Sequence, residues 1–403
     1  MPTYAFRKLH LSTRRDVVTE FGAAIPELPE HLISSLQNHS CLFKVLARPA
    51  EFPAELDAEL KQLGTRFWPV TSNTGYLFTD VETLQGLAQS PQLNSPAIRV
   101  FAEELGRFLQ RQQRRAFVLA TKPRPLQIGG RALIMGVLNC TPDSFYDGGR
   151  YFSHEAAIAH GQLLAEEGAE VIDIGGESTR PKGVYGGGAE PVSVEEEKRR
   201  VLPVIEALSK IVNLPLSIDT YKAAVASAAV QAGASLVNDI SGFQFDPQMP
   251  ETVAQLGVPV VIMHTKGSPA EMQSNPAYEN LLDELYLYFE EQIALARAAG
   301  IAADRLIIDP GLGFGKRVQD NYEILRRLPE FHGLGCPILI GPSRKSFVGK
   351  ALNLPPEQRL EGTAAAVAAA VMNGAHIIRV HDVREMRRVA TIAGLIAGRT
   401  ELQ

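Results

Sequence analysis

The 403-residue sequence has no long hydrophobic run, few cysteines and no excess of one charge. Its apolar runs, such as residues 258–263, fall far short of the about 18 residues of a membrane-spanning helix, so no such helix is expected. The first residues, MPTYAFRKLH, lack a basic stretch followed by an apolar core, so we expect no secretory signal. Three widely spaced cysteines predict neither a disulfide framework nor a CxxC metal site, and they suit a reducing, cytoplasmic compartment.

Charge and composition exclude further classes of protein. The 40 Lys and Arg residues nearly balance the 45 Asp and Glu residues, which argues against nucleic acid or an anionic membrane as the main partner. Hydrophobic residues make up 45% of the chain and charged residues 21%, values typical of a globular protein rather than a disordered or fibrous one. The length allows two or three domains of roughly 150 residues, although one α/β barrel can use about 250.

Residues 1–120 differ in pattern from the rest of the chain. Prolines break this part into short pieces, and the spacing of apolar residues predicts helices around 55–63 and 95–113. A short strand is expected at 116–120, and the following KPRPLQIGGRA predicts a linker and a domain boundary. We therefore predict a smaller α+β amino-terminal domain without a chemical motif. Packing, regulation and partner docking all stay open as its role.

From about residue 132 the pattern becomes regular, because short β-branched runs alternate eight times with amphipathic helical stretches. The predicted strands cover residues 132–138, 170–175, 215–219, 235–240, 259–263, 305–309, 337–341 and 376–380. Nearly continuous apolar runs are typical of parallel strands buried on both faces. Eight such units in residues 125–403 predict a (β/α)8 TIM barrel. A doubly wound open sheet is the competing fold, but no glycine-rich dinucleotide motif follows the first strand.

Every predicted strand carries polar or charged residues at its carboxyl end or is directly followed by them. They include Asn139, Glu177, Thr179, Arg180, Asp219, Asn238, Asp239, His264, Asp309, Ser343, Lys345, Arg379 and His381. In a barrel these strand ends converge on one mouth, where barrel enzymes have their active sites. A single Asp or Asn at such a position often caps the next helix, and this reading stays open for Asp239.

The chemical character of these residues suggests two groups. Asp219, Asn238 and Asp309 are compact hydrogen-bonding groups that suit a flat heterocycle with several N–H donors, and Lys345 could donate to the acceptors of such a ring. The second group, Arg379, His381 and Asn139, combines cationic donors with a neutral oxygen ligand. Such a set suits an anion bound together with Mg²⁺, which takes few protein ligands and bridges phosphate oxygens.

Two loops rich in Pro and Gly, residues 141–149 and 178–188, follow the first two strands and are predicted to act as lids over the mouth. Ordinary surface turns are the alternative. GLGFGK at 311–316 does not have the spacing of a phosphate-binding P-loop. Cys140 is interpreted as a buried thiol rather than a nucleophile, and His264 as a structural hydrogen-bonding residue.

Seven segments occur in order, one after another at the strand ends. They are MGVLNCTPDSFYDGG, IDIGGESTRP, SIDT, VNDISG, DPGLGFGK, GPSRKSF and RVHDV. Over residues 125–400 this order strongly resembles the dihydropteroate synthases of the pterin-binding barrel family. Residues 1–120 have no counterpart in typical members.

The resemblance implies condensation of 6-hydroxymethyl-7,8-dihydropterin diphosphate with 4-aminobenzoate, giving 7,8-dihydropteroate and diphosphate in folate biosynthesis. It implies an SN1-like transferase reaction, in which diphosphate leaves with help from Mg²⁺ before the aniline nitrogen attacks. It also implies a homodimer by fold-level analogy.

The same resemblance assigns roles to residues. Asp219, Asn238, Asp309 and Lys345 would hold the pterin, Arg379 and His381 the diphosphate, and Asn139 the Mg²⁺ ion. Thr179, Arg180, Pro181, Phe314 and Ser343 would shape the aminobenzoate pocket, and Asp147 would come from the first loop. The candidate catalytic residues are Asp147, Asp219, Asp309, Lys345 and Arg379.

The sequence departs from the family pattern at the mouth. Tyr146 replaces a small residue, Lys182 is inserted in STRPKG, and Thr265 and Lys266 change the segment after the fifth strand. These changes concern the aminobenzoate side and sulfonamide binding. Two other functions stay open. A pterin-dependent methyltransferase would share the pterin-binding residues Asp219, Asn238 and Asp309, but it has no use for the STRP and SRK segments. A non-catalytic pterin-binding paralogue would not need the complete site.

Overall fold

The computed structural model contains two compact units, which we describe separately. The first unit comprises Met1–Arg114 together with Arg327–Gly335, and the second comprises Arg115–Arg326 and Cys336–Gln403. The structure describes residues 3–11, 16, 20–21, 41–48, 51–53, 56–62, 65–79, 83, 86, 96–141, 153–178, 192–267 and 276–400. Within these ranges no helix is both long and apolar enough to cross a membrane.

The second unit is a parallel barrel, which confirms the predicted fold class. Its eight strands are β7 (Leu133–Asn139), β8 (Val171–Gly175), β9 (Leu216–Asp219), β10 (Leu236–Asp239), β11 (Val260–Met263), β12 (Leu306–Asp309), β13 (Leu339–Ile340) and β14 (Ile377–Val380). The strands pair in the order β12-β11-β10-β9-β8-β7-β14-β13. A parallel bridge between Ile308 and Ile338 joins the two ends of this sheet and closes the barrel.

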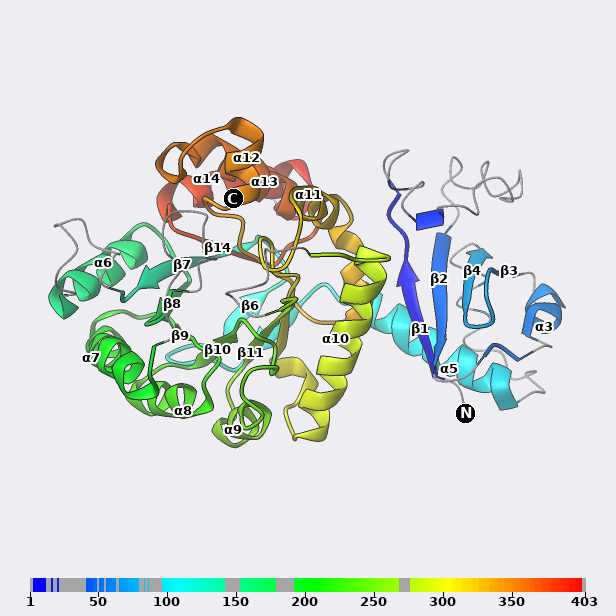
Figure 1. The fold of residues 1–403 in the computed structure, drawn as a ribbon, viewed down its shortest axis with the longest axis horizontal. Coiled ribbons are helices and arrows are strands. Elements are labelled where there is room, and N and C mark those ends of the chain that lie inside the picture. Colours follow the sequence, from blue (N-terminus) through cyan, green and yellow to red (C-terminus); the bar gives the residue numbers. More distant parts are fainter. Residues whose placement is uncertain are drawn as a thin grey trace. The chain divides into compact units, whose positions relative to one another are not determined.

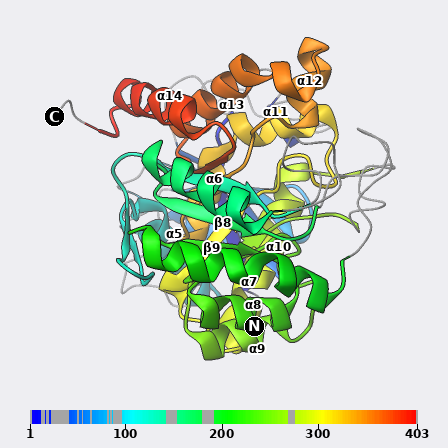
Figure 2. The ribbon, with the colours of Figure 1, turned by 90° about the vertical axis from the view of Figure 1, so that its left-hand side faces the viewer.

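Helices follow the strands on the outside of the barrel (Figure 1). They are α6 (His154–Glu166), α7 (Val194–Ile211), α8 (Ala223–Ala232), α9 (Met249–Leu256), α10 (Leu281–Ala298), α11 (Val318–Arg326), α12 (Ser346–Leu352), α13 (Leu360–Met372) and α14 (Val383–Ile396). Figure 2 shows α7, α8 and α9 as successive neighbours, and α13 beside α14. Short 3-10 turns lie at Ala303–Arg305 (η3) and Pro356–Gln358 (η5).

Local sequence explains where several helices begin and end. The side chains of Ser153, Ser193 and Asn280 accept hydrogen bonds from backbone N–H groups in the first turns of α6, α7 and α10. Gly168 and Gly233 follow α6 and α8 with positive φ angles of 98° and 123°, a conformation that glycine adopts without steric cost. These caps set the direction in which each helix returns to the next strand.

A two-stranded antiparallel hairpin precedes the barrel. Strand β5 (Phe117–Leu119) pairs with β6 (Leu126–Ile128), and both alternate buried and exposed residues. The buried side chains of the hairpin share one hydrophobic cluster with residues from the beginnings of the barrel strands. This cluster consists of Phe117, Leu119, Leu126, Ile128, Leu133, Met135, Val171, Leu236, Val261, Ile307, Leu339 and Ile377. The hairpin therefore packs at the amino-terminal end of the barrel and leaves the carboxyl end for polar residues.

The first unit combines an antiparallel sheet with helices. Strands β1 (Thr3–Lys8), β2 (Cys41–Arg48), β3 (Arg66–Pro69) and β4 (Thr74–Thr79) pair in the order β1-β2-β4-β3. Helices α3 (Leu56–Gln62) and α5 (Pro96–Gln113) contribute to its core. In that core, Phe6, Phe43 and Phe108 are almost fully buried, and the ring of Phe6 also packs edge-on against Phe101.

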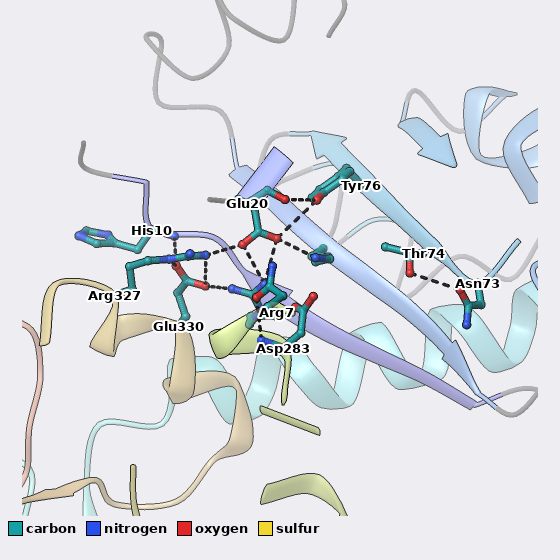
Figure 3. Close-up of polar contacts among 11 residues, drawn as sticks. Arg7, His10, Glu20, Asn73, Thr74, Tyr76, Asp283, Arg327 and Glu330 are labelled. Atoms are coloured by element: carbon teal, nitrogen blue, oxygen red, sulfur yellow. Dashed lines mark hydrogen bonds and ion pairs between the residues drawn. The ribbon is translucent and has the colours of Figure 1, made fainter. Parts of the chain in front are cut away.

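A 3-10 segment, η4 (Leu328–Leu334), belongs to the first unit although it lies between α11 and β13 in sequence. Figure 3 shows how buried ion pairs bind this segment. Glu20 accepts from Arg7 Nη2 at 3.0 Å and from Arg327 Nη2 at 2.6 Å. Arg327 Nε donates to Glu330 at 2.6 Å, and Arg7 also pairs with Glu330. The sequence pattern assigned all of residues 125–403 to the barrel domain. It gave no sign that Arg327–Gly335 belongs to the first unit.

Candidate active site

Carboxylates from β8 and β9 bind the guanidinium group of Arg379 on β14. Arg379 on β14 donates from Nε to Asp173 Oδ2 and from Nη2 to Asp219 Oδ2, both at 2.6 Å. The carboxylates raise the pKa of Arg379 above its usual value although burial alone would lower it. The sequence placed Arg379 in a separate group from Asp219, whereas the structure brings the two side chains into direct contact.

Asp173 lies among these residues although the strand-end pattern did not predict it. It lies in the middle of β8 and is fully buried. Besides Arg379, its Oδ2 accepts a hydrogen bond from Asn238 Nδ2 at 2.9 Å. The available signal was a charged residue inside the apolar run VIDIG, where a buried carboxylate requires a partner.

The ionisation of Asp219 is shifted by its surroundings. Burial raises the pKa of Asp219 to about 7, the positive charge of Arg379 opposes this shift, and the nearby Asp173 charge adds to it. A carboxyl group with such a pKa changes charge near neutral pH. Perturbed acids of this kind are common at functional sites.

Asp309 and Lys345 form the opposite side of the polar mouth. Asp309 Oδ1 accepts from Gly311 N at 2.8 Å, and Lys345 Nζ donates to Leu312 O at 2.5 Å. Burial lowers the pKa of Lys345 to about 8 against the attraction of Asp309, and burial raises the pKa of Asp309. The ammonium group of Lys345 also lies 4.8 Å from the ring centre of Phe314, within the range of a cation–π contact. Both loops after β12 and β13 are thus fixed to each other.

Ser343 and His381 contact each other directly. His381 Nδ1 lies 2.9 Å from Ser343 Oγ, and the His381 backbone N–H donates to the same oxygen at 3.2 Å. The family resemblance predicts different substrates for these two residues, whereas their contact joins the loops after β13 and β14. Asn139 ends β7, the strand that pairs with β14.

A separate cluster of charged side chains surrounds Glu177, in the loop after β8. Lys222 Nζ donates to Glu177 Oε2 and to Glu197 Oε2, both at 2.5 Å, and Tyr221 OH donates to Glu177 at 2.9 Å. Burial raises the pKa of Glu197 despite its bond to Lys222. The sequence analysis noted Glu177 but missed Lys222 and Glu197. Their contacts fix the end of β8 against the beginnings of α7 and α8.

Cys140 and His264 are structural, as the sequence predicted, and Asp239 has the capping role that the sequence left open. Cys140 is buried, and burial raises the pKa of its thiol to about 12, so it stays protonated. Asp239 accepts from the backbone N–H groups of Ser241 and Phe243 and thereby caps the turn after β10. His264 is buried, and its Nδ1 lies 2.9 Å from Lys316 Nζ.

Several predicted residues cannot be placed here. Asp147, Thr179, Arg180, Pro181, Tyr146 and Lys182 lie outside the described residues. Of the two described departures from the family pattern, Thr265 is buried, whereas Lys266 is exposed and donates to Glu284 at 2.8 Å and to Ala277 O at 2.6 Å. The Lys266 ammonium also lies over the ring of Tyr278. Lys266 is therefore engaged with the segment before α10.

The chain is similar to known proteins of one family. A family model described as pterin binding enzyme matches residues 135–381. The chain is 45% identical over 279 residues to the dihydropteroate synthase of Synechocystis sp., covering 67% of this chain and 94% of the relative. It is 48% identical over 252 residues to the dihydropteroate synthase of Escherichia coli, covering 62% of this chain and 87% of the relative.

Solved structures give the same result. The Yersinia pestis dihydropteroate synthase in a sulfonamide drug complex has a TM-score of 0.66 and 44% identity, covering 70% of this chain and 100% of that chain. The Xanthomonas albilineans dihydropteroate synthase with 4-aminobenzoic acid has a TM-score of 0.64 and 45% identity, covering 70% and 98%. The chain belongs to the family of pterin-binding enzymes. Within this family it is an enzyme of the dihydropteroate synthase type, a transferase of folate biosynthesis.

Proposed function

We propose that this chain condenses 6-hydroxymethyl-7,8-dihydropterin diphosphate with 4-aminobenzoate and releases 7,8-dihydropteroate and diphosphate. The observation that carries the proposal is the position of Arg379. Its Nε and Nη2 groups are bonded to Asp173 and Asp219, and its Nη1 group has no hydrogen-bond partner among the described residues. The Arg379 guanidinium is thus bonded to Asp219, a proposed pterin-binding residue, and it still offers donors to an anion.

Hydrogen-bond acceptors at the carboxyl end of the barrel would bind the pterin ring. Asp219, Asn238 and Asp309 present carboxylate and amide oxygens to N–H donors of the ring, and Lys345 donates to its carbonyl. Arg379 and His381 would bind the diphosphate. Thr179, Arg180, Pro181, Phe314 and Ser343 would contact 4-aminobenzoate, and Asp147 would arrive with the first loop.

We propose Mg²⁺ as the metal, with Asn139 as its protein ligand. Asn139 offers a neutral amide oxygen at the end of β7, and the neighbouring β14 carries Arg379. This donor set fits the ion, because Mg²⁺ takes few protein ligands and completes its shell with water and phosphate oxygens. When bound, it supplies positive charge to the diphosphate.

The proposed mechanism is SN1-like. The bond between the methylene carbon and the diphosphate oxygen breaks, and that oxygen keeps the electron pair. The aniline nitrogen of 4-aminobenzoate then bonds to the methylene carbon and loses a proton to solvent. Asp219 and Asp309 offset positive charge on the ring, while Arg379 offsets negative charge on the leaving group. No strong base is needed.

The test is turnover by the purified full chain. With Mg²⁺ and both substrates it should release diphosphate and form 7,8-dihydropteroate, measured by a coupled diphosphate assay and by chromatography. Chelation should stop the reaction, and added Mg²⁺ should restore it. Pterin binding without turnover would contradict the proposal and favour a non-catalytic paralogue, whereas methyl transfer would favour the methyltransferase reading.

We also propose that the chain forms a homodimer. The proposal rests on analogy with the fold, and the additional amino-terminal unit is the feature that could change it. Light scattering after size-exclusion chromatography should give about twice the 43.8 kDa mass of the chain, and a monomer mass at all concentrations would contradict it.

A further inference from the structure

Asp173 is a buried carboxylate near the mouth to which the proposed function gives no direct substrate contact. It is fully buried in the middle of β8, two residues before the strand ends at Gly175. Its Oδ2 accepts two hydrogen bonds, from Asn238 Nδ2 at 2.9 Å and from Arg379 Nε at 2.6 Å. Asn238 comes from β10 and Arg379 from β14, so one oxygen joins two strands on opposite sides of β8.

The bond to Asn238 fixes the orientation of an amide. An ionised carboxylate can only accept hydrogen bonds, so Asn238 must turn its NH₂ group toward Asp173. The amide oxygen of Asn238 then points away from Asp173. Without this acceptor, either end of the amide could face the ligand.

The bond to Arg379 fixes the orientation of a guanidinium. Asp173 holds Nε while Asp219 holds Nη2, so the planar group is clamped along one edge. The remaining Nη1 group is the part that can approach an anion. The same carboxylate oxygen therefore orients one residue of the proposed ring floor and one residue of the proposed diphosphate site.

We infer that Asp173 is a positioning residue that couples pterin recognition to diphosphate recognition, an inference that rests on the proposed function. A purely structural role explains the residue less well. Its second oxygen, Oδ1, is buried and has no hydrogen-bond partner among the described residues, which is unfavourable for stability. A well-packed apolar side chain is often as stable as a buried ion pair, so a carboxylate here requires another reason.

The experiment compares two variants of Asp173 with a control variant at Glu170, the residue directly before β8. Asp173→Leu replaces the two carboxylate oxygens by methyl groups, whereas Asp173→Asn keeps one neutral oxygen that can accept from the donors. Glu170→Gln is the control, because Glu170 accepts from Ile134 N at 2.7 Å at the beginning of β8, away from the mouth. For each protein we would measure the Kd of 6-hydroxymethyl-7,8-dihydropterin, the kinetics with the diphosphate substrate, and the melting temperature.

Asp173→Leu should weaken binding of the diphosphate-free pterin and raise the KM of the diphosphate substrate, each by about 10- to 100-fold. Asp173→Asn should bind the diphosphate-free pterin within about threefold of wild type. It should still raise the KM of the diphosphate substrate by about tenfold, because a neutral acceptor holds Arg379 less firmly. Glu170→Gln should leave both the Kd of the pterin and the KM of the diphosphate substrate within about twofold of wild type.

Equal Kd and KM values in wild type and both Asp173 variants would overturn the inference, and so would losses no larger than those of Glu170→Gln. If Asp173→Leu fails to fold, the split between the two ligands in Asp173→Asn decides the matter. Failure of the proposed function is distinguishable, because the wild-type chain itself would then neither bind the pterin nor turn over the substrates.

Discussion

At the scale of single residues, the mouth of the barrel holds an acid and a base with converging pKa values. Burial raises the pKa of Asp219 to about 7 and lowers the pKa of Lys345 to about 8. The proposed function needs Asp219 as an ionised acceptor and Lys345 as a protonated donor. Both conditions hold together only in a narrow range of pH.

We therefore predict a bell-shaped pH dependence of kcat/KM for the pterin diphosphate, with limbs near pH 7 and pH 8, because kcat/KM reports ionisations of the free enzyme. The acidic limb should belong to Asp219, which loses its charge as the pH falls. Lys345→Arg should remove the alkaline limb, since arginine stays protonated. Substrate ionisation is the same for both proteins, so an unchanged alkaline limb in Lys345→Arg would exclude Lys345 as its source.

Arg379 and Asp309 should respond differently to substitution. Arg379→Ala should raise the KM of the diphosphate substrate by about 100-fold and leave binding of diphosphate-free pterin largely intact, because a charged hydrogen-bonded contact is worth about 1.5–3 kcal/mol. Asp309→Ala should abolish binding of both ligands. Calorimetric titration with the two ligands checks this, and retained pterin binding in Asp309→Ala would rule out its place in the ring floor.

Sequence could predict the residues that end the strands but not all their contacts. Asp219, Asn238, Asp309, Lys345 and Arg379 stood out because each follows or ends an apolar run. Asp173 did not, since its role depends on side chains from β10 and β14, two strands that do not pair with β8. The contact between Arg379 and Asp219 spans 160 residues and likewise depends on closure of the barrel. Such relations come from tertiary geometry, and the local signal for Asp173 is limited to its charge inside the apolar run VIDIG.

At the scale of elements, the loop after β12 is held by close backbone contacts. Gly311 has a φ of 70°, and a Cβ atom there would lie 2.1 Å from the carbonyl oxygen of His264. Lys316 Nζ donates to the Phe314 carbonyl at 3.0 Å, which closes the loop from its other end. Burial lowers the pKa of Lys316 to about 7. Asp309 and Lys345 both bond to this loop, so its shape sets their positions.

Gly311→Ala should therefore damage both stability and ligand binding. The positive φ and the clash should destabilise the protein by at least about 1–3 kcal/mol, and displacement of the Gly311 N–H should weaken the hold on Asp309. Gly130→Ala is the matched control, because no atom lies within 4 Å of a Cβ added there. Thermal denaturation and pterin titration check both variants. Equal behaviour of the two would show that the loop tolerates the side chain.

The barrel strands were predictable because burial on both faces leaves continuous apolar runs, and all eight lie within one or two residues of the expected bounds. Helix α5 was predictable from its apolar spacing. Other elements gave weaker signals. Strand β6 has only three residues inside a proline-rich stretch, and α12 has seven residues directly after Lys345. In η4 the apolar residues Leu328, Phe331 and Leu334 recur every three positions, the period of a 3-10 turn, and the segment is too short to give an α-helical pattern. Short elements are stabilised by tertiary contacts rather than by their own sequence.

At the scale of the whole molecule, the first unit includes a short segment from the carboxyl-terminal part of the chain. The family match covers residues 135–381 without a break, yet Arg327–Gly335 within that range belongs to the first unit. Arg327 and Glu330 are fully or almost fully buried, and their charge partners Glu20 and Arg7 come from the amino-terminal part. A chain cut at residue 114 would therefore lose the partners of two buried charges. Removal of the first unit is not a neutral test of its role.

A point substitution tests this dependence without truncation. Glu20 is buried and pairs with Arg7, Lys44 and Arg327, whose positive charges lower its pKa well below the usual range although burial alone would raise it. Glu20→Gln leaves these cations with too little negative charge. It should lower the free energy of unfolding by about 3–5 kcal/mol, as removal of one partner of a buried ion pair does.

The control is Asp57→Asn on α3, which breaks the exposed pair between Asp57 and Lys61 at 2.6 Å and should cost no more than about 1 kcal/mol. Urea denaturation at several pH values separates the two cases. Because the folded-state pKa of Glu20 is depressed, its contribution is complete above the ordinary glutamate pKa of about 4.3 and is lost as the pH falls toward the folded value. The difference between wild type and Glu20→Gln should therefore be constant from pH 6 to 8 and shrink in acid. A difference as small as that of Asp57→Asn at neutral pH would mean that η4 does not depend on Glu20.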